Sequence, residues 1–283
     1  MSANPQELPG LAPPAAAAPG APAALRRRAA RLLGTGWILP AAALAVWEGA
    51  VRAGWVSAHL LPAPSEIVQT LIAFGAQGLA GHVLASSARV AAGFALGAVL
   101  AIAIGALVGL SRRAEGLLDP SFQALRAIPS LAWVPLLLLW LGIDEASKIA
   151  LISIGAFFPV YMGVASGFRD VDRKLVEAAR MYRLGSVAMV RRVLLPAALP
   201  AVLTGLRNGL SLAWMFMVAA ELIAATRGLG YLLTDGREMG RADIVLAAIV
   251  LLALLGKITD TAMAWAERRL LAWRDTYDST ARS

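Results

Sequence analysis

Long apolar stretches, each close to twenty residues, recur along this 283-residue chain and limit its fold more than any other feature. A bilayer core of about 30 Å is crossed by about 20 helical residues, and six stretches approach that length. They run approximately over residues 36–54, 82–110, 118–142, 146–168, 197–225 and 242–265. The sequence therefore predicts an all-α polytopic membrane protein with six transmembrane helices.

Composition supports a membrane protein and excludes several other classes. The chain is 59% hydrophobic and 16% charged, whereas soluble domains are about 45–50% apolar and about 25% charged. On so apolar a chain, the net charge of +8 does not indicate a nucleic-acid partner. With no cysteine and two histidines, we expect no disulfide, no thiolate nucleophile and no metal site.

The positive charges predict the topology. If the N-terminus is cytoplasmic, 17 of the 26 Lys and Arg residues fall in cytoplasmic segments and four in outer segments. Cytoplasmic loops carry the excess of positive charge in membrane proteins. We therefore expect a cytoplasmic (inner) membrane protein with both termini in the cytoplasm.

Four regions follow from this topology. We expect a disordered Pro/Ala-rich cytoplasmic tail with a basic cluster, then the first transmembrane helix with a periplasmic loop, then the transmembrane core, and finally a cytoplasmic C-terminal tail. Their ranges are 1–34, 35–81, 82–268 and 269–283. In the first helix, Glu48 and Arg52 lie four residues apart and can pair on one helix face.

Small residues recur at four-residue steps in the second stretch, which predicts close packing against another helix. They are Gly93, Gly97, Ala101, Gly105 and Gly109.

The segment 169–196 is too polar to cross the membrane and has helical periodicity. It predicts two short amphipathic helices, the first capped by Asp172 and carrying Leu175 and Tyr182 on its apolar face. Such helices could lie on the membrane surface or dock in a groove of a partner, and the pattern alone does not separate the two.

This segment resembles the EAA loop of ABC importer permeases, written EAA-x3-G-x9-I-x-LP. Glu177, Ala178 and Ala179 stand at the EAA positions, and Val193, Leu195 and Pro196 stand at the Ile and LP positions. The Gly position holds Arg183, which disfavours a left-handed turn that glycine would allow. Gly185 could provide that turn from two residues further on.

Further segments resemble the sulfonate, taurine and nitrate branch of these permeases, and most of all the aliphatic sulfonate permeases. The resemblance covers about residues 60–275, and its segments are 61–67, 126–135, 139–143, 228–232 and 254–257. It implies a type I ABC importer permease fold with a cytoplasmic coupling-helix loop. It also implies a homodimer in the bilayer that moves a small anionic solute by alternating access.

The resemblance further implies the partners. Cytoplasmic ABC ATPase subunits would bind ATP-Mg and seat the EAA loop in a groove, and a periplasmic solute-binding protein would deliver the solute. Glu177 would contact the ATPase, with Ala178 and Ala179 packing closely. This chain itself would bind no cofactor and carry no catalytic residue.

Polar residues inside two stretches are candidates for the translocation path, because intramembrane charges normally face protein or water. The candidates are Arg207, Ser211, Trp214 and Glu221 in the fifth stretch, and Arg126, Ser130 and Trp133 in the third. Alternatively, Arg207 and Arg126 snorkel, or pair with Glu221 or Glu48 to lock the bundle.

Two other classes of protein fit the sequence less well. An ion-gradient secondary transporter would favour half-repeats and a midplane carboxylate, whereas no repeat is visible and Glu221 and Asp260 fall toward helix ends. A membrane enzyme lacks support, because Gly256-Lys257 does not complete a nucleotide-binding loop.

Overall fold

The computed structural model describes residues 37–76 and 78–273, and every regular element among them is helical. The chain divides into two units, residues 1–56 and 57–283. The predicted tail 1–34 lies outside the described residues, as does most of the predicted C-terminal tail.

The first unit contains one described helix, α2 (Ile38–Arg52). Its 15 residues span about 22 Å, which is short of a full bilayer crossing. The predicted Glu48–Arg52 pair is confirmed, with the Arg52 Nε donating to Glu48 at 2.7 Å. The predicted first transmembrane helix is therefore shorter than its sequence pattern indicates.

Four helices of the second unit are long and apolar enough to cross a membrane. They are α4 (Leu79–Leu110), α7 (Glu145–Arg169), α10 (Leu195–Ala224) and α12 (Ala242–Leu270), and they match four of the six predicted spans. Around them lie α3 (Pro64–Ala76) and α11 (Leu229–Glu238). Thr70 of α3 donates to Asp243 of α12 at 2.8 Å.

The predicted third span is broken. It consists of α5 (Arg112–Ala127), the 3₁₀ turn η1 (Ser130–Trp133) and α6 (Val134–Leu141), with a bend of 89°. Proline disfavours a helical residue before it, and Ile128, before Pro129, is extended with φ −77° and ψ 123°. Counted as one span, the bent pair brings the number of candidate crossings among the described residues to five.

Helix α7 lies at the centre of the bundle, packed between α4 and α10. The predicted small-residue ridge of α4 makes the first of these contacts. A Cβ added at Gly93 would meet Ile152, and one added at Gly105 would meet Val164. The ridge therefore lets the two backbones approach closely, as predicted.

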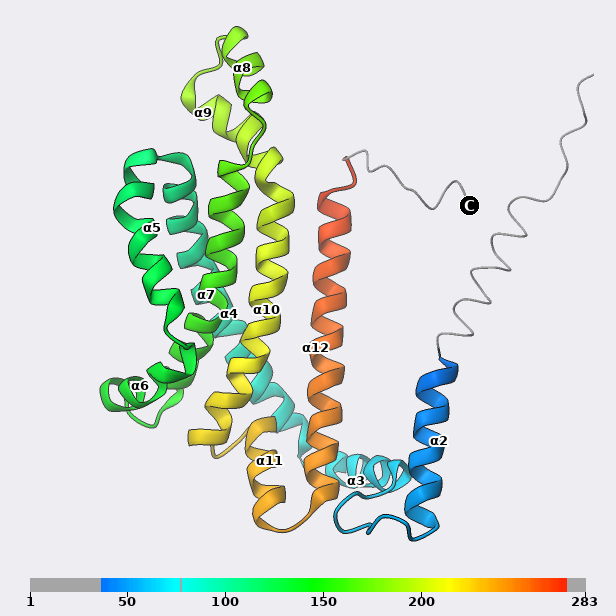
Figure 1. Ribbon diagram of the computed structural model, residues 1–283. Helices are drawn as coiled ribbons and strands as arrows, with labels where there is room; N and C mark the ends of the chain where they lie inside the picture. Colours follow the sequence, from blue (N-terminus) through cyan, green and yellow to red (C-terminus); the bar gives the residue numbers. More distant parts are fainter. Residues whose placement is uncertain (1–36, 77, 274–283) are drawn as a thin grey trace, which may run out of the picture. The chain divides into compact units, whose positions relative to one another are not determined.

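The connection from α7 to α10 projects beyond both helices (Figure 1). It contains α8 (Arg173–Met181), the single turn α9 (Ser186–Met189) and the π-helical segment η2 (Val190–Leu194). We call residues 170–196 the α8–α9 loop.

Candidate functional site

The α8–α9 loop begins and turns through local backbone geometry. Asp172 caps α8 as predicted, accepting a 2.8 Å hydrogen bond from the amide of Lys174. At the other end, Arg183 has a φ of 52°, in the left-handed region. Its amide donates to Arg180 at 2.9 Å, and the amide of Leu184 donates to Ala179 at 3.3 Å. These two hydrogen bonds form a left-handed helix C-cap, a position that glycine usually occupies.

The expectation that Gly185 provides the left-handed turn is therefore wrong. Gly185 is extended, with φ −67° and ψ 161°. The left-handed residue must lie just past the end of α8, and Arg183, at the Gly position of the motif, occupies that place. For a residue with a Cβ, this conformation costs about 1–2 kcal/mol.

The side chains of the α8–α9 loop are largely exposed. Glu177 pairs with Arg173 at 2.7 Å, and its side chain is 55% exposed. Ala178 is exposed and Ala179 is buried, while Tyr182 is 84% exposed. Val193 is half-buried in η2, and Leu195 and Pro196 form the first turn of α10. The apolar face that the sequence predicts on α8 is thus mostly uncovered in this chain.

A groove of about 660 Å³ runs along α7 and α10 and reaches the break between α5 and η1. Arg126 and Ser130 line it at the break. Thr204, Asn208 and Met215 line it from α10. A volume between about 300 and 1,000 Å³ is typical of small-molecule sites.

The structure brings together only two of the predicted path residues in this groove. Trp133 packs against the apolar core around Leu151 and Trp214. On α10, the Arg207 Nε donates to Asp260 of α12 at 2.6 Å, and the Trp214 Nε1 donates to Thr259 at 3.0 Å.

The remaining two predicted path residues also lie outside the groove lining. Ser211 donates to the carbonyl oxygen of Arg207 at 3.1 Å. Glu221 is 1% exposed in the bundle interior. The partner of Glu221 is not Arg207 but Arg89 of α4, at 2.7 Å. The groove is lined by a neighbouring face of α10 that includes Thr204 and Asn208, and the sequence pattern did not indicate that face.

A partly buried ionic network, which the sequence pattern did not predict, joins four helices near the ends of α7 and α10; the Arg89 and Glu221 side chains are buried, and that of Glu145 is 56% exposed. Arg89 donates to Glu145 of α7 at 2.6 Å and to Glu221 of α10 at 2.7 Å. Lys148 lies 3.0 Å from Glu145, and Gly230 of α11 donates its amide to Glu221 at 2.8 Å. The sequence contains one indication of this network, because Arg89 is a single charge within the most apolar stretch, and such a charge normally pairs inside the protein.

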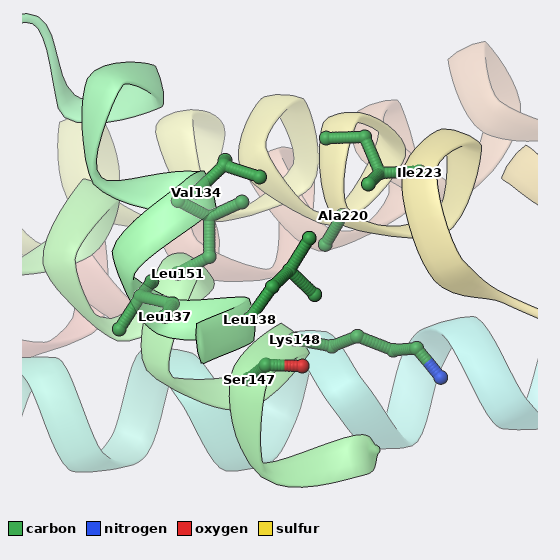
Figure 2. A pocket seen from close by; sticks show the side chains of 8 residues that line it. All are labelled: Val134, Leu137, Leu138, Ser147, Lys148, Leu151, Ala220 and Ile223. Atoms are coloured by element: carbon green, nitrogen blue, oxygen red, sulfur yellow. The ribbon is translucent and has the colours of Figure 1, made fainter. Parts of the chain in front are cut away.

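A second cavity beside this network is too small for a solute. It has a volume of about 10 Å³ and is lined mainly by apolar side chains of α6, α7 and α10. Figure 2 shows Lys148 extending its amino group away from Val134 and Leu137. Among the described residues, no group of three or more His, Cys, Asp or Glu side chains could hold a metal ion.

The chain is similar to known transport proteins along most of its length. Residues 93–272 match the family described as "Binding-protein-dependent transport system inner membrane component". A putative aliphatic sulfonates transport permease protein of Bacillus subtilis is 46% identical, over 86% of this chain and 88% of its own. Its Escherichia coli counterpart is 43% identical, over 85% and 92%. The Escherichia coli taurine transport system permease protein is 36% identical, over 81% and 86%.

A solved structure agrees on the fold. A chain of the MetNI methionine ABC transporter, in inward-facing conformations, has a TM-score of 0.59 and 21% sequence identity. The match covers 67% of this chain and 94% of that chain. The protein therefore belongs to the family of binding-protein-dependent transport system inner membrane components, the permeases of ABC transporters.

Proposed function

We propose that this chain is the transmembrane subunit of an ATP-driven importer for small aliphatic sulfonates. The observation that carries the proposal is the exposed α8–α9 loop, which combines the EAA motif with uncovered apolar side chains. The chain would sit in the cytoplasmic (inner) membrane with both termini and this loop in the cytoplasm. ATP-Mg would be bound and hydrolysed by a separate ATPase subunit.

The loop has the chemistry of a protein-docking surface. Met181, Tyr182 and Val187 are among its most exposed side chains, and contiguous exposed apolar surface favours burial against a partner. An amphipathic helix that lays its apolar face into a groove is a common mode of recognition. We assign this surface to the ATPase rather than to the lipid surface, because it projects past the ends of α7 and α10 (Figure 1).

The substrate class is supported by the named relatives. Two of them are named for aliphatic sulfonates at 46% and 43% identity, and a third for taurine at 36%. A bicarbonate permease protein of Synechococcus elongatus is 35% identical over 69% of this chain. Sulfonate, taurine and bicarbonate share a small oxyanion, so a small anionic solute is the common feature. A periplasmic solute-binding protein and a second copy of this chain would complete the importer.

The docking role can be tested by charge reversal at Glu177. We expect Glu177→Arg to fold and insert but to lose co-purification with the ATPase, because it replaces the exposed carboxylate of the EAA motif by a cation. Glu238→Arg is the matched control, since Glu238 is an exposed carboxylate at the end of α11, far from the loop. Normal ATPase binding and uptake by Glu177→Arg would contradict the proposal.

A further inference from the structure

The groove along α7 and α10 carries a single kind of charge. Among the described residues, its lining contains Arg126 and no Asp or Glu, and the other polar side chains of the lining are neutral. These neutral groups are Ser130 at the α5–η1 break, Ser166 on α7, and Thr204 and Asn208 on α10. A lining with one cation and several hydroxyl or amide groups suits an anion that also accepts hydrogen bonds.

Arg126 differs from two other arginines within the predicted spans, Arg89 and Arg207. Arg89 pairs with Glu145 and Glu221, and Arg207 pairs with Asp260. The side chain of Arg126, an exposed residue on the groove, makes no hydrogen bond or ion pair with any residue in the described part of the chain. A charge within a membrane-spanning region is costly unless it faces water, protein or a ligand. Its position on the groove therefore leaves its charge available to a solute.

Apolar side chains line the rest of the groove. Phe158 and Met162 of α7 and Leu212, Met215 and Phe216 of α10 contribute them. The lining thus offers one cationic group and an apolar wall within a volume of about 660 Å³. That combination fits a molecule with a compact oxyanion at one end and a short alkyl chain at the other.

We propose that this groove contains a membrane subsite for small alkyl oxyanions, in which Arg126 pairs with the oxyanion head. Ser130 and Asn208 donate hydrogen bonds to the head, and the apolar wall contacts the alkyl chain. The inference rests on the proposed function, since it assigns the solute's class to a site within the importer. In this proposal the solute contacts the face of α10 that carries Thr204 and Asn208. The sequence had instead predicted that the translocation path follows the face with Arg207, Ser211, Trp214 and Glu221.

Uptake measurements test the role of Arg126. In proteoliposomes containing the complete importer, we expect Arg126→Gln to lower uptake of labelled ethanesulfonate at least about tenfold, the loss typical of one charge-assisted hydrogen bond. We expect Arg126→Lys to retain more uptake than Arg126→Gln. Arg113→Gln is the matched control, since Arg113 is an exposed arginine in the first turn of the same helix. Wild-type uptake by Arg126→Gln overturns the subsite.

A chemical probe tests the same site without transport. Because the chain has no cysteine, Ser130→Cys provides a single thiol in the groove. Its labelling rates are compared for the anionic sulfonatoethyl and the cationic trimethylammonioethyl methanethiosulfonates. When Arg126→Gln is introduced into the Ser130→Cys protein, we expect the ratio of the anionic to the cationic labelling rate to fall at least about threefold, because a nearby positive charge is lost.

The same ratio at Ser186→Cys, on the exposed α8–α9 loop, should not change when Arg126 is replaced. An unchanged ratio at position 130 overturns the subsite.

The outcomes also separate the two proposals. If the wild-type complex shows no ATP-dependent uptake of ethanesulfonate, the proposed function fails. If wild-type uptake is normal and Arg126→Gln behaves like Arg113→Gln, only the subsite fails.

Discussion

The guanidinium of Arg89 on α4 lies 2.7 Å from the carboxylate of Glu221 on α10, and both side chains are almost fully buried. The two residues are separated by 132 positions in the chain. Glu221 also accepts hydrogen bonds from Ser86 and from the amide of Gly230. This carboxylate therefore joins α4, α10 and the start of α11.

Removing Arg89 should strongly destabilise the bundle. Arg89→Leu leaves the buried Glu221 without its cation, and breaking a buried pair in this way costs about 3–5 kcal/mol. We expect the thermal midpoint of the purified protein in detergent to fall by several degrees, whereas Arg113→Leu should leave it nearly unchanged. Equal midpoints for the two variants would show that the pair is dispensable. The double variant Arg89→Leu/Glu221→Leu should lose less stability than the sum of the losses measured for the two single variants.

Glycine should be required at position 228. Gly228 has a φ of 139°, and a Cβ added there would collide with the Glu221 carboxylate. A strained backbone of this kind costs about 1–3 kcal/mol, so Gly228→Ala should lower the thermal midpoint. Gly116→Ala is the control, because Gly116 lies in α5 with open space around it and alanine favours a helix there. A Gly228→Ala variant as stable as Gly116→Ala would contradict this assignment.

Glycine should be favoured at position 183. Arg183→Gly relieves the left-handed strain of about 1–2 kcal/mol, partly offset by the greater freedom of glycine in the unfolded chain. We expect slower proteolysis of the α8–α9 loop in Arg183→Gly than in wild type. Gly185→Ala should be tolerated, because Gly185 is extended and open space surrounds it. Faster cleavage of Arg183→Gly would contradict the turn geometry.

Replacing Arg207 distinguishes two possible faces of α10. Arg207 is 40% exposed, pairs with Asp260 and lies outside the groove lining. We therefore expect Arg207→Leu, once shown to be folded, to retain ethanesulfonate uptake. Loss of uptake in a folded Arg207→Leu protein would instead favour the path face predicted from the sequence.

Much of the fold follows from local sequence patterns. Four long helices and the α4 ridge were predictable, because apolar length and small residues at four-residue steps are properties of single segments. The break at Ile128–Pro129 is visible in the sequence as a proline, but the 89° bend depends on how α5 and α6 pack. The shortness of α2 was not evident, because apolar residues continue past the ends of the helix.

The candidate site was only partly predictable. Arg126 and Ser130 were identified because they are polar residues in an apolar stretch. On α10, the larger polar residues Arg207 and Glu221 attracted the prediction, yet their partners Asp260 and Arg89 lie 53 and 132 residues away. Helical periodicity groups residues on a face but does not say what that face contacts. The groove face with Thr204 and Asn208 therefore required the structure.

In the proposed function, ATP bound by a partner at the α8–α9 loop drives sulfonate import. The most direct measurement is accumulation of labelled ethanesulfonate in proteoliposomes holding this chain, its ATPase and its solute-binding protein. We expect accumulation that requires ATP and the binding protein, is lost in Glu177→Arg and is retained in Glu238→Arg. Accumulation driven by an ion gradient without ATP, or full accumulation by Glu177→Arg, would contradict it.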